Sequence, residues 1–208
     1  GSDSFTFTVA DGDGGTLPAT AFAITATPVN DAPTFAAGDG IVTTDLGGHD
    51  YGRSVTVQAD GRILVAGYSA NGGTTDFALA RYHADSRLDG AFGDDGTVTT
   101  PIGMSNDVGS SVTVQADGRI LVAGYSTNGS NDFALVRYHA DGSLDGTFGN
   151  GGTVTTDIGM SNDVGSSVTV QADGKILVAG YSTNGGTADF ALVRYHADGS
   201  LDGTFGNG

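Results

Sequence analysis

The sequence predicts an all-β protein made of three similar four-stranded units that follow an N-terminal β-hairpin. Two observations lead to this fold class. The segment 111–148 recurs with small changes, so that its first residue, Ser111, has counterparts at Ser54 and Ser167, 57 and 56 residues away. All 24 acidic residues are Asp and Lys175 is the only lysine, which leaves the strongest charged helix formers nearly absent. A self-similar period of this length indicates an array whose units cannot bury their apolar faces alone.

The segment that recurs in each repeat begins with a predicted β-hairpin. Val112 and Val114 alternate with polar residues, the triplet Ala-Asp-Gly ending at Gly118 turns the chain, and 119–125 returns. Gly at the end of a three-residue connection suits a left-handed backbone conformation. The returning strand and the next one, 133–138, are apolar on both faces, as expected for strands that are covered on both sides. A fourth strand, 153–156, begins the next unit.

Residues 4–29 differ from everything downstream and predict a separate hairpin. Apolar side chains alternate with Thr before the polar turn DGDGG and with small or polar residues after it. The segment DSFTFTVADGDGGTLPATAFAITATPVNDAPTF resembles the last two strands of the bacterial cadherin-like and Ig-like modules of large adhesins. The resemblance implies that 1–29 is the terminal hairpin of such a module and that 30–37 is its Asn-Asp-Ala-Pro linker.

The linker carries the first candidate metal site. In cadherins the linker Asn-Asp pair contributes oxygen ligands to calcium, so the resemblance implies a calcium role for Asn30 and Asp31. Calcium needs six to eight oxygens, which two residues do not supply. The alternative is a rigid linker that Pro28 and Pro33 hold extended.

The remaining chain consists of the repeats 38–93, 94–149 and 150–206, and 207–208 begins a further one. The motifs LVAGYS, DFALVRY, DGSLDGTFG and GGTVTT resemble the delta-60 repeat of large exported bacterial proteins. This resemblance implies a β-propeller-like array of four-stranded blades and an extracellular or cell-surface location. No single biochemical activity is associated with that repeat.

Composition limits the possible ligands. The net charge of −16 disfavours nucleic acid and anionic membrane surfaces, because phosphate groups would be repelled. No apolar run is long enough for a membrane span. Without cysteine there is no disulfide, thiolate metal site or cysteine nucleophile. Cation binding remains possible, because the repeat aspartates could line sites between units, although most are expected to cap turns; they include Asp107, Asp117, Asp132, Asp141 and Asp145.

An Arg ends the apolar strand of each repeat, and an Asp follows eight residues later. We interpret these residues as structural pairs, since a partly buried guanidinium needs a carboxylate partner. A substrate-binding ring of Arg side chains is the alternative. The pairs are Arg81 with Asp89, Arg137 with Asp145, and Arg194 with Asp202.

Two further residue types recur once in each repeat. Tyr68, Tyr125 and Tyr181 could form sugar platforms between blades, or could simply pack at the end of a strand. His83, His139 and His196 suggest a Ser-His-Asp arrangement, but closeness in sequence provides neither a held base nor an oxyanion hole. No catalytic residue is therefore predicted.

The leading functional hypothesis is a non-enzymatic structural or adhesive segment of a large secreted or cell-surface protein. The alternative is a carbohydrate-binding propeller module with equivalent pockets between blades, and a third possibility is an accessory part of an extracellular enzyme. Natural propellers use about four to eight blades. We therefore expect further repeats or self-association to cover the outer apolar faces, so that this chain alone is not a monomer.

Overall fold

The computed structural model describes residues 40–159, 161–184 and 186–206. The chain divides into two compact units, Gly1–Thr34 and Phe35–Gly208. The expected hairpin 1–29 and linker 30–37, with the candidate ligands Asn30 and Asp31, lie outside the described residues.

The second unit consists of three antiparallel sheets, in agreement with the predicted all-β fold. The first two sheets have four strands each, and the third has three among the described residues. None of the described residues belongs to a helix that is long and apolar enough to cross a membrane. The strands are β1 (His49–Val57), β2 (Ile63–Asn71), β3 (Thr74–Tyr82), β4 (Thr97–Thr100), β5 (Asp107–Val114), β6 (Ile120–Asn128), β7 (Ser130–Tyr138), β8 (Thr153–Thr156), β9 (Asp163–Val170), β10 (Ile176–Asn184) and β11 (Thr187–Tyr195).

The hairpin between β5 and β6 has the predicted turn. Gly118 has φ 85°, a left-handed conformation that costs glycine nothing because it has no Cβ. The Gly118 amide donates to the Gln115 carbonyl at 2.9 Å, and Asp117 Oδ1 accepts from the Arg119 amide at 3.0 Å. The Ala-Asp-Gly motif therefore forms a hydrogen-bonded turn in which the Asp side chain accepts a backbone amide.

The sheets are offset from the sequence repeats. Strand β4 begins repeat 94–149 but pairs with β3, and β8 begins repeat 150–206 but pairs with β7. Each Thr-Val-Thr-Thr segment thus completes the sheet of the preceding repeat. The third sheet, β9 to β11, has no such strand among the described residues.

A buried hydroxyl pair fastens each of these segments to the sheet of its own repeat. Thr100 Oγ1 on β4 accepts from the Tyr138 hydroxyl at 2.8 Å, and Thr156 on β8 makes the same bond to Tyr195. Burial raises the pKa of Tyr195 to about 12, against the effect of the hydrogen bond from its hydroxyl to Thr156. In the first repeat, Thr44 lies 2.7 Å from the Tyr82 hydroxyl, so the segment around it occupies the place equivalent to β4.

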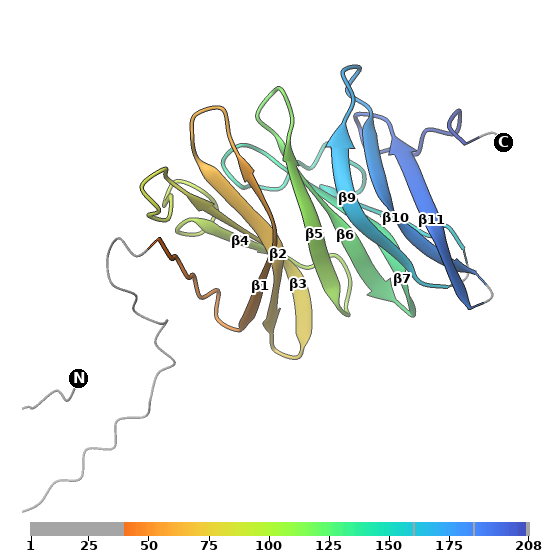
Figure 1. Cartoon of the computed structure of the whole chain (residues 1–208), viewed down its shortest axis with the longest axis horizontal. Coiled ribbons are helices and arrows are strands. Elements are labelled where there is room, and N and C mark those ends of the chain that lie inside the picture. The colour runs from red at the N-terminus through yellow and green to blue at the C-terminus, as the bar shows by residue number, and fades with distance from the viewer. Residues whose placement is uncertain (1–39, 160, 185, 207–208) are drawn as a thin grey trace, which may run out of the picture. The chain divides into compact units, whose positions relative to one another are not determined.

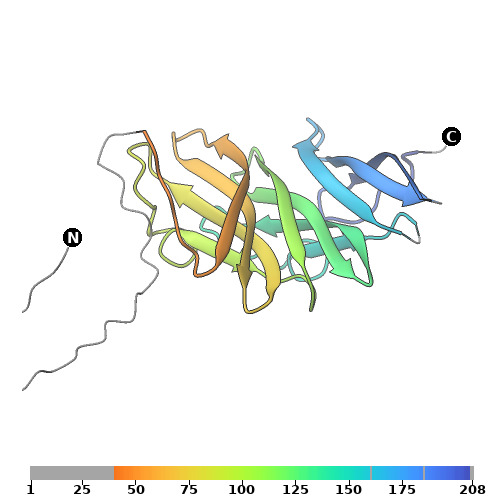
Figure 2. The ribbon, with the colours of Figure 1, turned by 60° about the horizontal axis from the view of Figure 1, so that its bottom comes forward.

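Successive sheets pack face to face, in chain order (Figures 1 and 2). Phe77 and Leu79 of the first sheet share one core with Ile120 and Val136 of the second. The other face of the second sheet, which includes Phe133, forms a core with the third. The middle sheet is therefore buried on both faces, as predicted from its doubly apolar strands.

The outer faces of the first and third sheets expose apolar side chains. Val55 and Val57 on β1 are each 65% exposed. Phe190 and Leu192 on β11 are 105% and 54% exposed, although Phe133, the counterpart of Phe190 in the second sheet, is buried. Packing against a following sheet therefore buries this position.

A β-bulge in the first strand of each sheet brings neighbouring sheets close together. Between Gly109 and Ser111 the pairing of β5 with β6 skips one residue. A Cβ on Gly109 would lie 2.5 Å from the Gly67 carbonyl oxygen of the preceding sheet, and one on Gly124 would lie 1.8 Å from the Val108 carbonyl oxygen across the bulge. Beside the bulge, the Val112 amide donates to Ser54 Oγ of the first sheet at 3.2 Å. Glycine is thus required on both sides of the bulge.

Replacing Gly124 with Ala tests this requirement. The new methyl group would overlap a backbone oxygen, so we expect the free energy of unfolding to fall by roughly 3 kcal/mol or more. Gly146→Ala is the matched control, because a Cβ at that exposed position meets nothing within 4 Å. Chemical denaturation of the two variants measures the difference, and equal stabilities would contradict the proposed tight contact.

Candidate functional site

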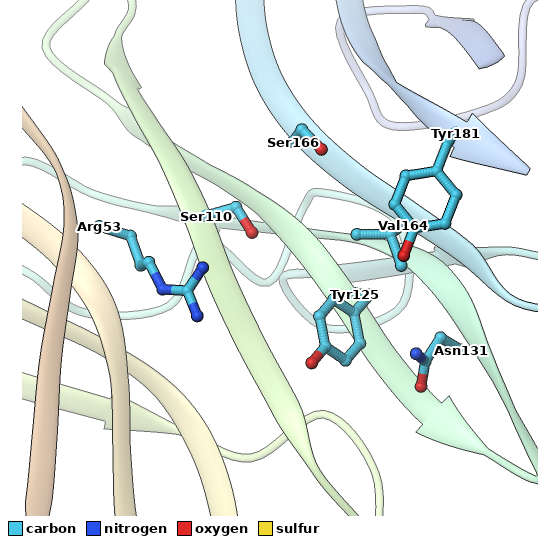
Figure 3. A pocket seen from close by; sticks show the side chains of 7 residues that line it. All are labelled: Arg53, Ser110, Tyr125, Asn131, Val164, Ser166 and Tyr181. Carbon is cyan, nitrogen blue, oxygen red and sulfur yellow. The ribbon is translucent and has the colours of Figure 1, made fainter. Parts of the chain in front are cut away.

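The recurring tyrosines lie near a cavity beside the first strands of the sheets. Tyr68, Tyr125 and Tyr181 each follow the glycine that faces a bulge, on β2, β6 and β10. The cavity has a volume of about 410 Å³, and Figure 3 shows the side chains around it. Its lining consists of Arg53, Ser110, Tyr125, Asn131, Val164, Ser166 and Tyr181. Arg53, Ser110 and Ser166 are the extra residues of the three bulges.

Arg53 links the tyrosine of its own sheet to the cavity. Its Nη2 donates to the Tyr68 hydroxyl at 3.4 Å, and its guanidinium carbon lies 5.2 Å from the centre of the Tyr68 ring. Tyr68 also stacks on Tyr51, with 4.8 Å between ring centres. In Figure 3 the guanidinium is directed toward Ser110 and Tyr125.

The surroundings of Tyr125 have opposing effects on the pKa of its hydroxyl. Burial raises the pKa of Tyr125, the positive charge of Arg53 lowers it, and the neighbouring Tyr68 and Tyr181 raise it. Hydroxyl, amide and guanidinium groups together can hydrogen-bond a small polar ligand, and the exposed Tyr181 ring offers a flat apolar surface. The lining has no His, Asp, Glu or Cys to act as a base beside its serines.

Two equivalent grooves lie at the junctions between sheets. One has a volume of about 540 Å³ and includes Asp141 and Ser143, and the other, about 520 Å³, includes Asp198 and Ser200. Their linings contain Thr, Gly, Asp and Ser but no aromatic residue. The two equivalent grooves are therefore not lined by the recurring tyrosines.

The three Arg-Asp pairs are present as hydrogen-bonded ion pairs. Arg137 is buried, and its Nε donates to Asp145 Oδ2 at 2.8 Å. Its Nη1 donates to the Ala197 carbonyl of the next repeat at 2.5 Å, and its guanidinium carbon lies 4.4 Å from the centre of the Phe148 ring. We call Arg137, Asp145 and Phe148, with the Ala197 carbonyl, the latch.

The Arg-Asp pair and the nearby Phe ring recur in the other repeats, and in the first repeat the bond to the next repeat recurs as well. Arg81 donates to Asp89 at 2.8 Å and to the Ala140 carbonyl of the next repeat, and Arg194 donates to Asp202 at 2.8 Å. Because these guanidinium groups are occupied by protein acceptors, their geometry fits structural pairs better than a substrate-binding ring.

The Asp145 carboxylate is completely buried and satisfied on both oxygens. Oδ1 accepts from the Thr147 amide at 3.0 Å and from the Thr147 hydroxyl at 2.6 Å, and Arg119 lies 3.0 Å from Oδ2. Burial raises the pKa of Asp145, but the bonds from Thr147 and Arg137 outweigh it and lower the pKa to about 2. The latch is therefore charged at neutral pH.

The histidines border the latches. His139 Nε2 lies 3.8 Å from Asp145 Oδ1, and His83 and His196 stand in the same relation to Asp89 and Asp202. Ser143 donates its hydroxyl to Asp141, not to His139. No Ser-His-Asp hydrogen-bond chain links these residues within the described part of the protein.

An acidic cluster lies where the second sheet meets the third. One carboxylate oxygen from each of Asp132, Asp157 and Asp163 lies within 4.8 Å of the others. Burial raises the pKa of Asp132, and the charges of Asp157 and Asp163 raise it further. Of the aspartates first considered for cation sites, Asp132 belongs to this cluster, whereas Asp117 and Asp141 cap turns. Asp107 accepts the Ile102 and Gly103 amides.

Sequence reasoning did not identify several of these residues. Arg53, Ser110 and Ser166 reach the cavity only because of the bulges, which no local pattern marked. Asp157 could have been found, because position 157 is one of the few at which the second and third repeats differ: its counterpart is Pro101.

Comparison with known families agrees with this architecture. A family model described as "Domain of unknown function (DUF5122) beta-propeller" matches residues 58–92, 115–148 and 171–205, which together make up half of the chain. The chain therefore belongs to this β-propeller family, which confirms the propeller-type repeat. A search of curated proteins found no match.

Replacing Arg137 with Leu tests the structural role of the latch. Loss of the guanidinium leaves a buried carboxylate with only Arg119 as a cationic partner at close range, so we expect a loss of roughly 3 kcal/mol in unfolding free energy. Arg87→Leu is the control, because the exposed Arg87 pairs with Asp85 in its own turn. Equal thermal unfolding curves for the two variants would contradict a structural latch.

Proposed function

We propose that this chain is a non-enzymatic structural and adhesive repeat segment of a larger secreted or cell-surface protein. The observation that supports this most directly is the latch, in which Arg81 and Arg137 each bind a buried Asp of their own repeat and a backbone carbonyl of the next repeat. The Arg-Asp pairs and the turn-capping Asp141 are hydrogen-bonded within the protein, and the cavity lacks a paired nucleophile and base.

Adhesion would use the exposed outer faces. Phe190 and Leu192 present an apolar surface on the third sheet, and Val55 and Val57 present another on the first. Apolar sheet faces of this kind associate readily in water. Further repeats of the same chain, or a second copy of it, are the partners that such a surface fits.

Size exclusion with light scattering tests this proposal. We expect the wild-type chain to self-associate in a concentration-dependent way, and Phe190→Ser to shift it toward the mass of one chain, 20.7 kDa. Met104→Ser is the control, because Met104 is 97% exposed but lies in a connection between sheets and not on an outer face. A wild-type chain that remains monomeric at high concentration would contradict an adhesive role for these faces.

Carbohydrate binding is the second candidate, and the tyrosine cavity is the observation that favours it. Aromatic rings with nearby hydroxyl, amide and guanidinium groups suit the apolar and polar faces of a sugar. The repeated grooves provide polar groups without a ring to stack on.

A glycan array with two variants distinguishes these sites. If the cavity binds sugar, Tyr181→Ala should reduce binding at least tenfold, because the stacking surface is lost, whereas Ser200→Ala in the groove should not. The reverse result would assign binding to the grooves. An array without any signal would remove the carbohydrate hypothesis and leave the structural one intact.

A further inference from the structure

The acidic cluster of Asp132, Asp157 and Asp163 joins three separate parts of the chain. Asp132 is on β7, Asp157 directly follows β8, and Asp163 begins β9 of the next sheet. Phe133 and Thr156 are the last pair between β7 and β8, so Asp132 and Asp157 are neighbours just beyond that ladder. The cluster therefore spans the point where the second sheet connects to the third.

Asp163 is held rigidly with one oxygen free. It is 0% exposed, and its Oδ2 accepts from the Ile158 amide at 2.7 Å and from the Gly159 amide at 3.2 Å. Its Oδ1 is buried and has no hydrogen-bond partner, and the same is true of Asp132 Oδ1. A buried carboxylate oxygen without a partner is costly, which points to a ligand that neither sheet provides.

No cationic side chain among the described residues forms an ion pair with the cluster. Every ion pair among the described residues involves other aspartates, namely Asp60, Asp85, Asp89, Asp117, Asp145, Asp173 and Asp202. Three carboxylates thus face one another in a chain of net charge −16. Such a group attracts a small cation.

We propose that Asp132, Asp157 and Asp163 bind a calcium ion that fastens the second sheet to the third. Calcium takes oxygen ligands at about 2.3–2.6 Å, so two ligands of one ion are at most about 5 Å apart, which the 4.8 Å limit of this cluster satisfies. Carboxylates are hard ligands, and calcium tolerates irregular geometry better than magnesium does. Waters complete its coordination.

The junction between the first and second sheets provides a natural comparison. Asp76 and Asp107 are the counterparts of Asp132 and Asp163, and Asp107 Oδ1 is likewise buried without a partner. Pro101 replaces the third carboxylate. The proposal therefore predicts one calcium site in the three repeats, at the second junction.

Exchanging residues between the two junctions tests the proposal on the full chain. Isothermal titration with calcium chloride should show one site for the wild type, none for Asp157→Pro and two for Pro101→Asp. Each exchange uses the residue that the other repeat already carries, so the variants should fold. Asp132→Asn keeps the shape of the side chain and should weaken calcium binding at least tenfold.

Thermal unfolding provides a second readout. Ligands that bind only the folded state raise the melting temperature, and about 10 mM calcium should raise that of the wild type by roughly 3–6 °C over a chelator control. Asp157→Pro should show no such rise, and magnesium should have a smaller effect.

Two outcomes would overturn the assignment. If Asp157→Pro responds to calcium as the wild type does, while Asp31→Ala does not, the ion binds at the linker that resembles that of cadherins. If neither titration nor melting responds to calcium at millimolar concentration, the free oxygens of Asp132 and Asp163 are satisfied by water and the cluster is not a metal site.

Discussion

The packing of the sheets depends on a charge that each repeat buries. Asp145 is fully buried, and its partner Arg137 reaches both this carboxylate and the Ala197 carbonyl of the following repeat. A buried carboxylate without cationic partners would destabilise the fold, and the bond from Arg137 to the Ala197 carbonyl ties this buried pair to the following repeat. The ion pair thereby couples the folding of one repeat to that of the next, as expected for an array with strong nearest-neighbour interactions.

The glycines beside the bulges impose the second constraint. Gly109 allows the backbone of β5 to approach the Gly67 carbonyl of the preceding sheet, and Gly124 leaves room for the Val108 carbonyl. The bulge residue itself is released from the ladder and faces the cavity, as Ser110 does. The feature that sets the spacing of the sheets therefore also selects the side chains of the candidate ligand cavity.

Much of the fold could be predicted because the sequence repeats itself and its local patterns are consistent. Alternating Val residues, the Ala-Asp-Gly turn and the doubly apolar strands are local signals, and eight-residue spacing was enough to pair Arg137 with Asp145. The offset between repeats and sheets was not predictable from local patterns. It depends on whether β8 pairs with a strand that precedes it, as it does with β7, or with one that follows it. The bulges were missed because they depend on how two strands pair, and the cluster of Asp132 with Asp163 was missed because it forms only where two sheets meet.

The near identity of the repeats makes their few differences informative. Residues that maintain the array, such as the latch, must recur at every junction, whereas a residue that serves one junction need not. The equivalent positions 101 and 157 serve one junction each, because Pro101 and Asp157 both follow the end of the same short strand in their repeats. The side chains with a specific role in a repeat array are therefore best sought where the copies disagree, next to buried groups that remain unsatisfied, as Asp163 does at the second junction.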